Sequence, residues 1–224
     1  KSKYIFISAP ENVAWLLNIR GYDNPTSPIP NCHLLLDDKK KVFLIVEKKK
    51  EKKLVKEKKI FKQQIIEPKN FGYLIKKIKK GKIIIDKSSC SIYYENLIKR
   101  NLEIKSNEDP IYHLKSLKTP NEINSMIDTH VSDGVALTKF LYWIKKINKK
   151  KITEIEAEKK LEKFRKKNKN FLYPSFDTIA GSGKNGAIVH YRAKKQNCRT
   201  IGKNDIFLCD SGGQYKYGTT DVTR

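Results

Sequence analysis

The hydrophobic positions in the first half of the chain follow two alternating patterns. Short apolar runs typical of buried strands are separated by stretches in which apolar residues recur at helical spacing. Strands that alternate with helices of this length predict an α/β layer with a mostly parallel sheet. We expect strands at residues 3–7, 32–36, 41–46, 61–66, 82–86 and 102–104, with 32–36 and 41–46 joined as a hairpin, and helices near 11–20, 47–59, 71–80 and 91–100.

Local signals predict where some of these helices begin and end. Ser8 and Glu11 have the spacing of a capping box, which predicts that the first helix starts there. Gly21 is expected to end that helix, and Gly81 is expected to end the helix near 71–80.

A second region of regular structure follows a polar, turn-forming stretch at 107–110, so we predict one domain at residues 1–116 and another at 117–224. Thr119, Pro120 and Glu122 carry the signals of a helix start. This helix is expected to reach about Ile147, with His130 as a packed core residue on its apolar stripe. The stripe comprises Ile123, Ile127, Val131, Val135 or Gly134, Thr138 and Leu141.

A further helix and two strands are predicted next. Thr153 and Glu156 form a second capping box, which starts a helix with apolar residues on its inward face. Strands are expected at 177–180 and 187–192, and the second places His190 on a face with Ile188 and Arg192. The glycine-rich segment between them lacks the residue order of a phosphate-binding loop, and no helical pattern follows it.

The last twenty residues predict a hairpin that brings two aspartates together. An apolar run at 206–208 and a β-branched run at 219–223 flank a turn at 214–217, and this register places Asp210 opposite Asp221. Like charges directly opposed across two strands repel, so a shared proton or a bound cation is needed to neutralise them. A pair of metal ions suits two such carboxylates. The alternative is that they are two unrelated aspartates that flank a turn at a strand end.

Composition narrows the possible classes of protein. The 224 residues suit one large or two modest domains, and no segment of 18 apolar residues predicts a membrane span. The opening residues lack the pattern of a signal peptide, so we expect a cytoplasmic protein. The four cysteines have no paired spacing, which favours reduced thiols over a zinc motif or a disulfide framework.

The formal net charge of +24 is unusual, but it does not indicate a nucleic-acid site. The lysine runs are scattered through both halves, with no interleaved stacking aromatics and no concentration on one element. We expect weak nonspecific attraction to polyanions at low salt and no specific nucleic-acid partner.

The segments FLYPSFDTIAGSGKNGAIVHYR (171–192) and IFLCDSGGQYKYGTTDVTR (206–224) resemble the Xaa-Pro aminopeptidases (aminopeptidase P) of the pita-bread metallopeptidase superfamily. The stretch ENVAWLLNIRGYD (11–23) resembles the second, creatinase-like domain of the three-domain cytosolic type. The resemblance therefore implies a creatinase-N-terminal-like α/β domain followed by an incomplete pita-bread (α+β) catalytic domain.

The resemblance also implies an activity and site residues. Asp210 and Asp221 match two ligands of a dinuclear metal centre, and His190 matches a histidine near the substrate. The implied reaction releases an N-terminal residue that precedes proline. Two divalent ions are implied, with manganese first and zinc, cobalt or iron as alternatives, since carboxylates suit all of these. The implied partners are peptides with proline at the second position, and a second copy of the chain in a homodimer.

Part of the family's site has no match in this sequence. A histidine and two glutamates complete the metal centre downstream of the second aspartate, and the sequence ends at Arg224. We therefore expect the 224-residue chain to bind metal weakly and to be inactive. Two alternatives stay open, a prolidase-like or creatinase-like enzyme and a noncatalytic peptide-binding relative. Arg20 and Asp23 either line the cleft or form a local ion pair.

Overall fold

The computed structural model describes residues 2–78, 80–146 and 151–224. It comprises two compact units, one up to Leu117 and one from Lys118. None of the described helices is long and apolar enough to cross a membrane.

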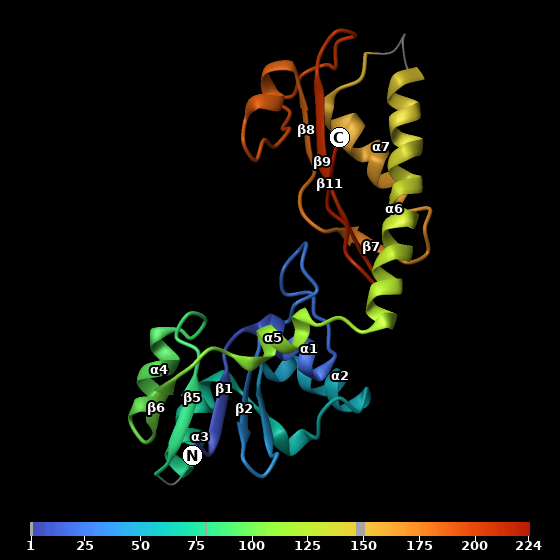
Figure 1. The fold of residues 1–224 in the computed structure, drawn as a ribbon. Coiled ribbons are helices and arrows are strands. Elements are labelled where there is room, and N and C mark those ends of the chain that lie inside the picture. The colour runs from blue at the N-terminus through green and yellow to red at the C-terminus, as the bar shows by residue number, and fades with distance from the viewer. Residues whose placement is uncertain (1, 79, 147–150) are drawn as a thin grey trace. The chain divides into compact units, whose positions relative to one another are not determined.

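The first unit contains a six-stranded sheet in the order β4-β3-β2-β1-β5-β6 (Figure 1). The pairs β1–β5, β5–β6 and β3–β4 are parallel, whereas β1–β2 and the hairpin β2–β3 are antiparallel. The predicted hairpin and the α/β layer are therefore confirmed, in a sheet of mixed direction. The strands are β1 (Tyr4–Ile7), β2 (His33–Asp37), β3 (Val42–Ile45), β4 (Ile65–Ile66), β5 (Lys82–Ile85) and β6 (Glu103–Ser106).

Both faces of this sheet are covered by helices. Because successive residues of a strand point to opposite sides, each strand contributes to two cores. Ile7 and Leu34 belong to a core shared with helices α1 (Pro10–Leu17) and α5 (Pro110–Ser116). Phe6 and Leu35 belong to a second core shared with α3 (Phe71–Lys77) and α4 (Ile92–Lys99). Helix α2 (Glu51–Lys56) packs Leu54 against the first core.

The predicted ends of α1 are wrong at both positions. The Ser8 hydroxyl is hydrogen-bonded to Ser89 at 2.8 Å, and α1 starts at Pro10 without a side-chain cap. The helix ends before Asn18, which adopts the left-handed conformation (φ 47°) that asparagine tolerates better than most residues. Gly21 lies further on, where its N–H donates to Pro28.

Three other elements of the first unit differ from the prediction. The expected strand at 61–66 is mostly the 3₁₀ turn Lys62–Gln64, and only β4 pairs with the sheet. Helix α3 ends at Lys77, before Gly81, because Ile78 is extended. Helix α5 was not predicted; the Asp109 carboxylate caps it by accepting from the N–H of Ile111 at 2.9 Å.

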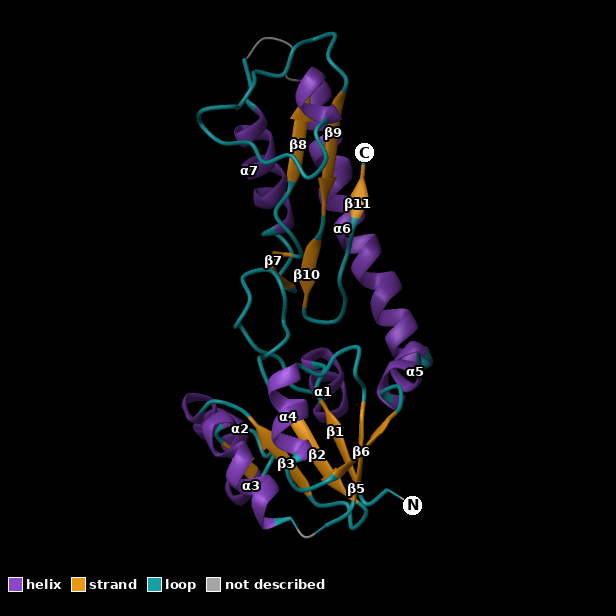
Figure 2. Ribbon diagram, turned by 90° about the vertical axis from the view of Figure 1, so that its left-hand side faces the viewer, coloured by secondary structure: helices purple, strands orange, loops and turns teal. Residues whose placement is uncertain are grey.

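The second unit packs two helices against a small antiparallel sheet in the order β11-β9-β8 (Figure 2). Leu137 and Phe140 of α6, Leu161 of α7 and Cys209 of β9 form its core. The elements are α6 (Pro120–Lys146), α7 (Glu154–Arg165), β7 (Phe171–Pro174), β8 (Ile179–Ser182), the 3₁₀ helix Gly183–Ala187, β9 (Phe207–Ser211), β10 (Gly213–Tyr215) and β11 (Val222–Thr223), with β10 paired to β7.

The predicted helix start at Thr119 and the predicted capping box at Thr153 are both confirmed. Glu122 accepts from the N–H of Thr119 and donates its own N–H to the Thr119 hydroxyl, and Thr153 and Glu156 make the same exchange at the start of α7. The predicted end of α6, Ile147, lies outside the described residues.

The predicted inward face of α6 is wrong. Its apolar stripe is exposed at Ile123, Ile127, Val131 and Val135, and His130 is exposed as well, with Nδ1 3.0 Å from the carbonyl of Met126. The buried face instead contains Thr129, Asp133, Ala136, Leu137 and Phe140. Periodicity missed this face because it includes a charged residue, which can be buried only with a partner.

Candidate active site

Asp210 lies in β9 and Asp221 directly precedes β11, and the register of these two antiparallel strands differs from the prediction by two residues. Thr223 pairs with Asp210 and Val222 with Ser211, so Asp221 faces Gly212 instead of Asp210. A shift of two residues keeps every side chain on its original face of the sheet. The two aspartates therefore share a face as diagonal neighbours, at a typical separation of about 7–8 Å between such positions.

The register is set by contacts at the turn. The N–H of Thr220 donates to the carbonyl of Gly213, and the N–H of Gly213 donates to the Thr220 hydroxyl. The N–H of Tyr215 donates to the carbonyl of Gly218. A Cβ on Gly212 would lie 2.0 Å from the carbonyl oxygen of Thr220 and 2.2 Å from the Ser175 hydroxyl. Only glycine fits this close approach of the two strands.

The two carboxylates are accessible. Asp210 is half-buried and accepts one hydrogen bond, from the Thr223 hydroxyl at 2.9 Å, and Asp221 is exposed. Two accessible carboxylates fit a hard or borderline divalent cation. Within the described residues no third histidine, cysteine, aspartate or glutamate joins them in a cluster.

A buried ion pair supports the strand that follows Asp210. Arg165 donates from Nε and Nη2 to the two oxygens of Asp133 at 2.7 and 3.0 Å, and the Tyr215 hydroxyl donates to the same carboxylate at 2.7 Å. Burial raises the pKa of Asp133, but the hydrogen bond and charge of Arg165 outweigh it and bring the pKa below its usual range. Burial and the bond to Asp133 raise the pKa of Tyr215.

His190 lies in the connection between β8 and β9, and the predicted strand at 187–192 is wrong. The 3₁₀ helix Gly183–Ala187 is followed by a turn in which the N–H of Tyr191 donates to Ile188 at 3.2 Å. His190 is exposed and has a φ of 54°, so it does not share a strand face with Ile188 and Arg192. Within the described residues no hydrogen bond or ion pair links His190 to either aspartate.

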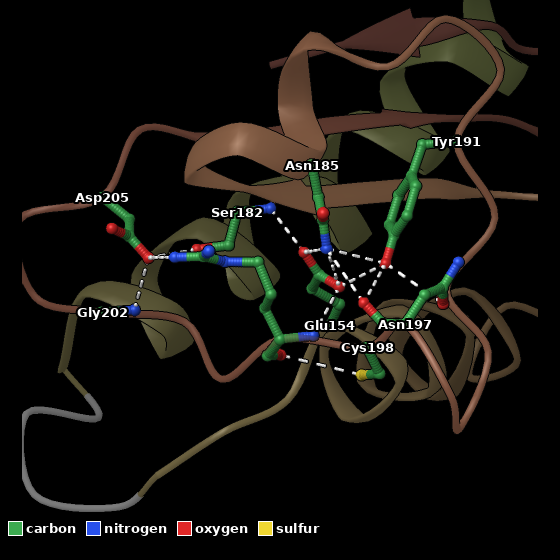
Figure 3. A network of polar contacts seen from close by, with 9 residues as sticks. Glu154, Ser182, Asn185, Tyr191, Asn197, Cys198, Gly202 and Asp205 are labelled. Carbon is green, nitrogen blue, oxygen red and sulfur yellow. Dashed lines mark hydrogen bonds and ion pairs between the residues drawn. The ribbon is translucent and has the colours of Figure 1, made fainter.

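A buried carboxylate that the sequence analysis did not single out holds this connection. Glu154, the first residue of α7, is 0% exposed and accepts hydrogen bonds from Ser182, Asn185, Tyr191 and Arg199 (Figure 3). The only sequence signal was its place directly after Thr153, at a helix start where an acidic residue is common.

Arg20 and Asp23 belong to the first unit and do not pair with each other. Asp23 forms an ion pair with Lys50 and accepts from the N–H of Asn31 at 2.6 Å, while Arg20 donates to the carbonyl of Ile19. Burial raises the pKa of Asp23, but the bonds from Lys50 and Asn31 bring it below its usual value. Asp23 thus makes a local ion pair, with Lys50 as its partner.

Two family models together match nearly the whole chain. The model of the creatinase/prolidase N-terminal domain matches residues 1–122, and that of metallopeptidase family M24 matches residues 124–224. The chain belongs to the pita-bread metallopeptidases of this family. The resemblance noted in the sequence and the predicted fold class are confirmed.

Among the pita-bread metallopeptidases, the chain is similar in sequence to Xaa-Pro aminopeptidases. It is 35% identical over its full length to a probable Xaa-Pro aminopeptidase P of Paracoccidioides brasiliensis (strain Pb03), covering 39% of that protein. It is 36% identical over 98% of its length to the Xaa-Pro aminopeptidase ApepP of Drosophila melanogaster, covering 37% of it. The chain thus spans about two fifths of the length of these relatives.

Solved structures of the family share the fold. The X-prolyl aminopeptidase of Caenorhabditis elegans, described as a cytosolic enzyme with a di-nuclear active site, superposes with a TM-score of 0.83 at 25% identity; 100% of this chain covers 38% of it. Prolidase from Pyrococcus furiosus gives a TM-score of 0.73 at 25% identity, with 100% of this chain covering 65% of it.

Proposed function

We propose that this chain is part of a metal-dependent aminopeptidase that hydrolyses the bond between an N-terminal residue and a following proline. The placement of Asp210 and Asp221 on one face of the paired strands carries the proposal. The sequence similarity to Xaa-Pro aminopeptidases along the whole chain supports the substrate class.

In this proposal Asp210 and Asp221 hold two divalent ions, with manganese as the first candidate and zinc, cobalt or iron as alternatives. Such ions, when bound, supply water activation and polarisation of the scissile carbonyl. The aspartates supply oxygen ligands and compensating negative charge. His190 presents an exposed imidazole that orients the substrate by a hydrogen bond or handles a proton, as imidazoles do near neutral pH.

The proposal extends to partners and place of action. Its substrates are peptides with proline second, its assembly is a homodimer, and it acts in the cytoplasm without a specific nucleic-acid partner. A prolidase-like enzyme or a noncatalytic peptide-binding relative remains the alternative. The higher TM-score with the X-prolyl aminopeptidase supports the aminopeptidase over the prolidase.

Metal binding by the 224-residue chain is the first test. Titration with Mn²⁺, followed by the electron paramagnetic resonance signal of the free ion, is expected to show weak binding. We expect Asp210→Asn and Asp221→Asn to weaken it by about tenfold or more, because each removes a charged oxygen ligand. Asp128→Asn, which changes an exposed aspartate of α6, is the matched control. Equal binding by all four proteins would refute the assigned ligands.

Activity is the second test. The 224-residue chain is expected to cleave no prolyl peptide, and cleavage that persists with chelator would contradict the proposal. We would also read the gene beyond Arg224 and assay its whole product, with metal, on a tripeptide and a dipeptide that both have proline second. Cleavage of the tripeptide supports the aminopeptidase, cleavage of the dipeptide alone supports a prolidase, and binding without cleavage supports the noncatalytic alternative.

A further inference from the structure

The segment that presents His190 needs an anchor. Residues 183–206 connect β8 to β9 and contain no described strand. His190 adopts a left-handed conformation that is unfavourable for a non-glycine residue, and such a conformation persists only where the surroundings fix it. Ile188 and Val189, just before it, are 52% and 83% exposed, so the segment has few packing contacts of its own.

Glu154 accepts hydrogen bonds from residues on both sides of the turn that contains His190. Its carboxylate accepts from Asn185 Nδ2 at 3.1 Å to each oxygen and from the Tyr191 hydroxyl at 2.8 Å. These two residues bracket the exposed turn, one five positions before His190 and the other directly after it. Asn185 and Tyr191 are also hydrogen-bonded to each other at 2.9 Å (Figure 3).

The same carboxylate ties the segment to the rest of the unit. It accepts from the backbone N–H groups of Ser182 at 2.7 Å and Arg199 at 2.9 Å, which come from the last residue of β8 and from the return of the connection. The N–H of Glu154 in turn donates to the Arg199 carbonyl at 3.1 Å. A fully buried carboxylate is costly unless its hydrogen bonds are satisfied, and this one is satisfied largely by the segment that carries His190.

We propose that Glu154 is a positioning residue that, through Tyr191 and Asn185, holds His190 in its left-handed, outward-facing conformation. This inference deepens the proposed function and rests on it for the role of His190 at the substrate. The placement of the imidazole itself is a property of the folded chain, and it can be measured without metal or turnover.

The test uses the imidazole resonances of the chain, which has four histidines, His33, His113, His130 and His190. The His190 resonance is assigned by its loss in His190→Gln. Tyr191→Phe keeps the buried ring and removes the hydroxyl, and Glu154→Gln keeps the shape and removes the charge. Tyr215→Phe is the matched control, because it removes an equally buried hydroxyl–carboxylate bond in the same unit.

We expect the His190 resonance to shift and broaden in Tyr191→Phe and in Glu154→Gln, and to stay unchanged in Tyr215→Phe. An unchanged resonance in Tyr191→Phe overturns the inference, even if Glu154→Gln does not fold. A shift in all three variants also overturns it, because a general loss of stability then explains the change.

A second readout separates this inference from the proposed function. In the whole, metal-loaded product of the gene, Tyr191→Phe is expected to lower kcat/KM for a Xaa-Pro peptide by roughly tenfold, as modest misplacement of an active-site group does. If His190→Gln leaves kcat/KM unchanged, the proposed role of His190 fails. The resonance shifts still decide whether Glu154 positions it.

Discussion

Gly212 and Gly134 are glycines of the same unit with opposite surroundings. An alanine methyl at 212 would meet the Thr220 carbonyl oxygen at 2.0 Å, whereas at 134, inside α6, nothing lies within 4 Å. Gly212→Ala is expected to lower the free energy of unfolding by about 2–3 kcal/mol through overpacking. Gly134→Ala is expected to raise it by about 1 kcal/mol, the usual gain of alanine over glycine in a helix.

Urea unfolding of both variants checks this pair of predictions. The measured quantity is the shift of the transition midpoint, provided that the slope of the unfolding free energy against urea concentration stays the same. A Gly212→Ala variant as stable as the parent chain would mean that the strands carrying the two aspartates do not pair in the described register.

Asp133 gives the second unit a predicted pH dependence. The pKa of its carboxyl is lowered in the folded state. The stabilisation of the fold by the ionised carboxylate is therefore fully present above the unfolded pKa of about 3.9, and it is lost as the pH falls through the folded pKa. We expect Asp133→Asn to cost about 3–5 kcal/mol at neutral pH, because it leaves Arg165 buried without its charge partner. Below about pH 4 the difference from the parent chain should narrow.

Urea titrations of the parent chain and of Asp133→Asn at pH 7 and at several values below pH 4 measure this difference. Asp128→Asn is the control, since its carboxylate is exposed. A constant difference at all pH values would contradict the assigned linkage.

On helix α6 an apolar side chain is not necessarily a buried one. Ile127 is 55% exposed, whereas Phe140 on the same helix is 0% exposed and packs in the core. Ile127→Ser is therefore expected to change the free energy of unfolding by about 0.5 kcal/mol or less. Phe140→Ala is expected to cost about 3–5 kcal/mol.

Thermal and urea unfolding of the two variants distinguish the faces of α6. Comparable destabilisation by both substitutions would show that the stripe at Ile127 is packed in the folded chain, as periodicity alone predicts.

Sequence signals predicted helix starts correctly where the interacting residues are close together in the sequence. The helix start at Thr119 and the capping box at Thr153 lie where predicted, because in each case the bonded residues are three positions apart. The Ser8 pattern failed because a partner distant in sequence, Ser89, takes the hydroxyl. The predictions of the buried face of α6 and of a strand at His190 were wrong for a similar reason. Both features depend on partners distant in sequence, Arg165 for the α6 face and Glu154 for the His190 turn.

At the scale of the whole molecule, each unit has its own hydrophobic core. The two clusters of the first unit contain residues from Tyr4 to Ile111 only, and the cluster of the second contains residues from Leu137 to Val222 only. We expect residues 1–117, expressed alone, to unfold cooperatively, because a sheet covered on both faces buries enough apolar surface.

Coincident urea transitions by far-ultraviolet circular dichroism and tyrosine fluorescence would establish this, with the 224-residue chain as the reference. A gradual loss of signal without a transition would show that the first unit depends on the second.

The alternation of strands and helices was enough to predict the α/β layer of the first unit, because this alternation can be recognised from hydrophobic periodicity and turn residues alone. The pairing of the strands that flank the two aspartates was predicted two residues out of register. Face depends on the two-residue period of a strand, whereas register depends on the close approach at Gly212, which sequence pattern does not reveal.

The exposed stripe of α6 and the net charge of +24 have opposite effects on the encounter of two molecules. Charge of one sign keeps copies apart, and the stripe offers apolar surface on which they can associate. Salt shortens the screening length from about 10 Å at 0.1 M to about 3 Å at 1 M, and it weakens only the repulsion. The colloidal stability of this chain therefore decreases as ionic strength rises, and dilute buffer is the condition that keeps it dispersed.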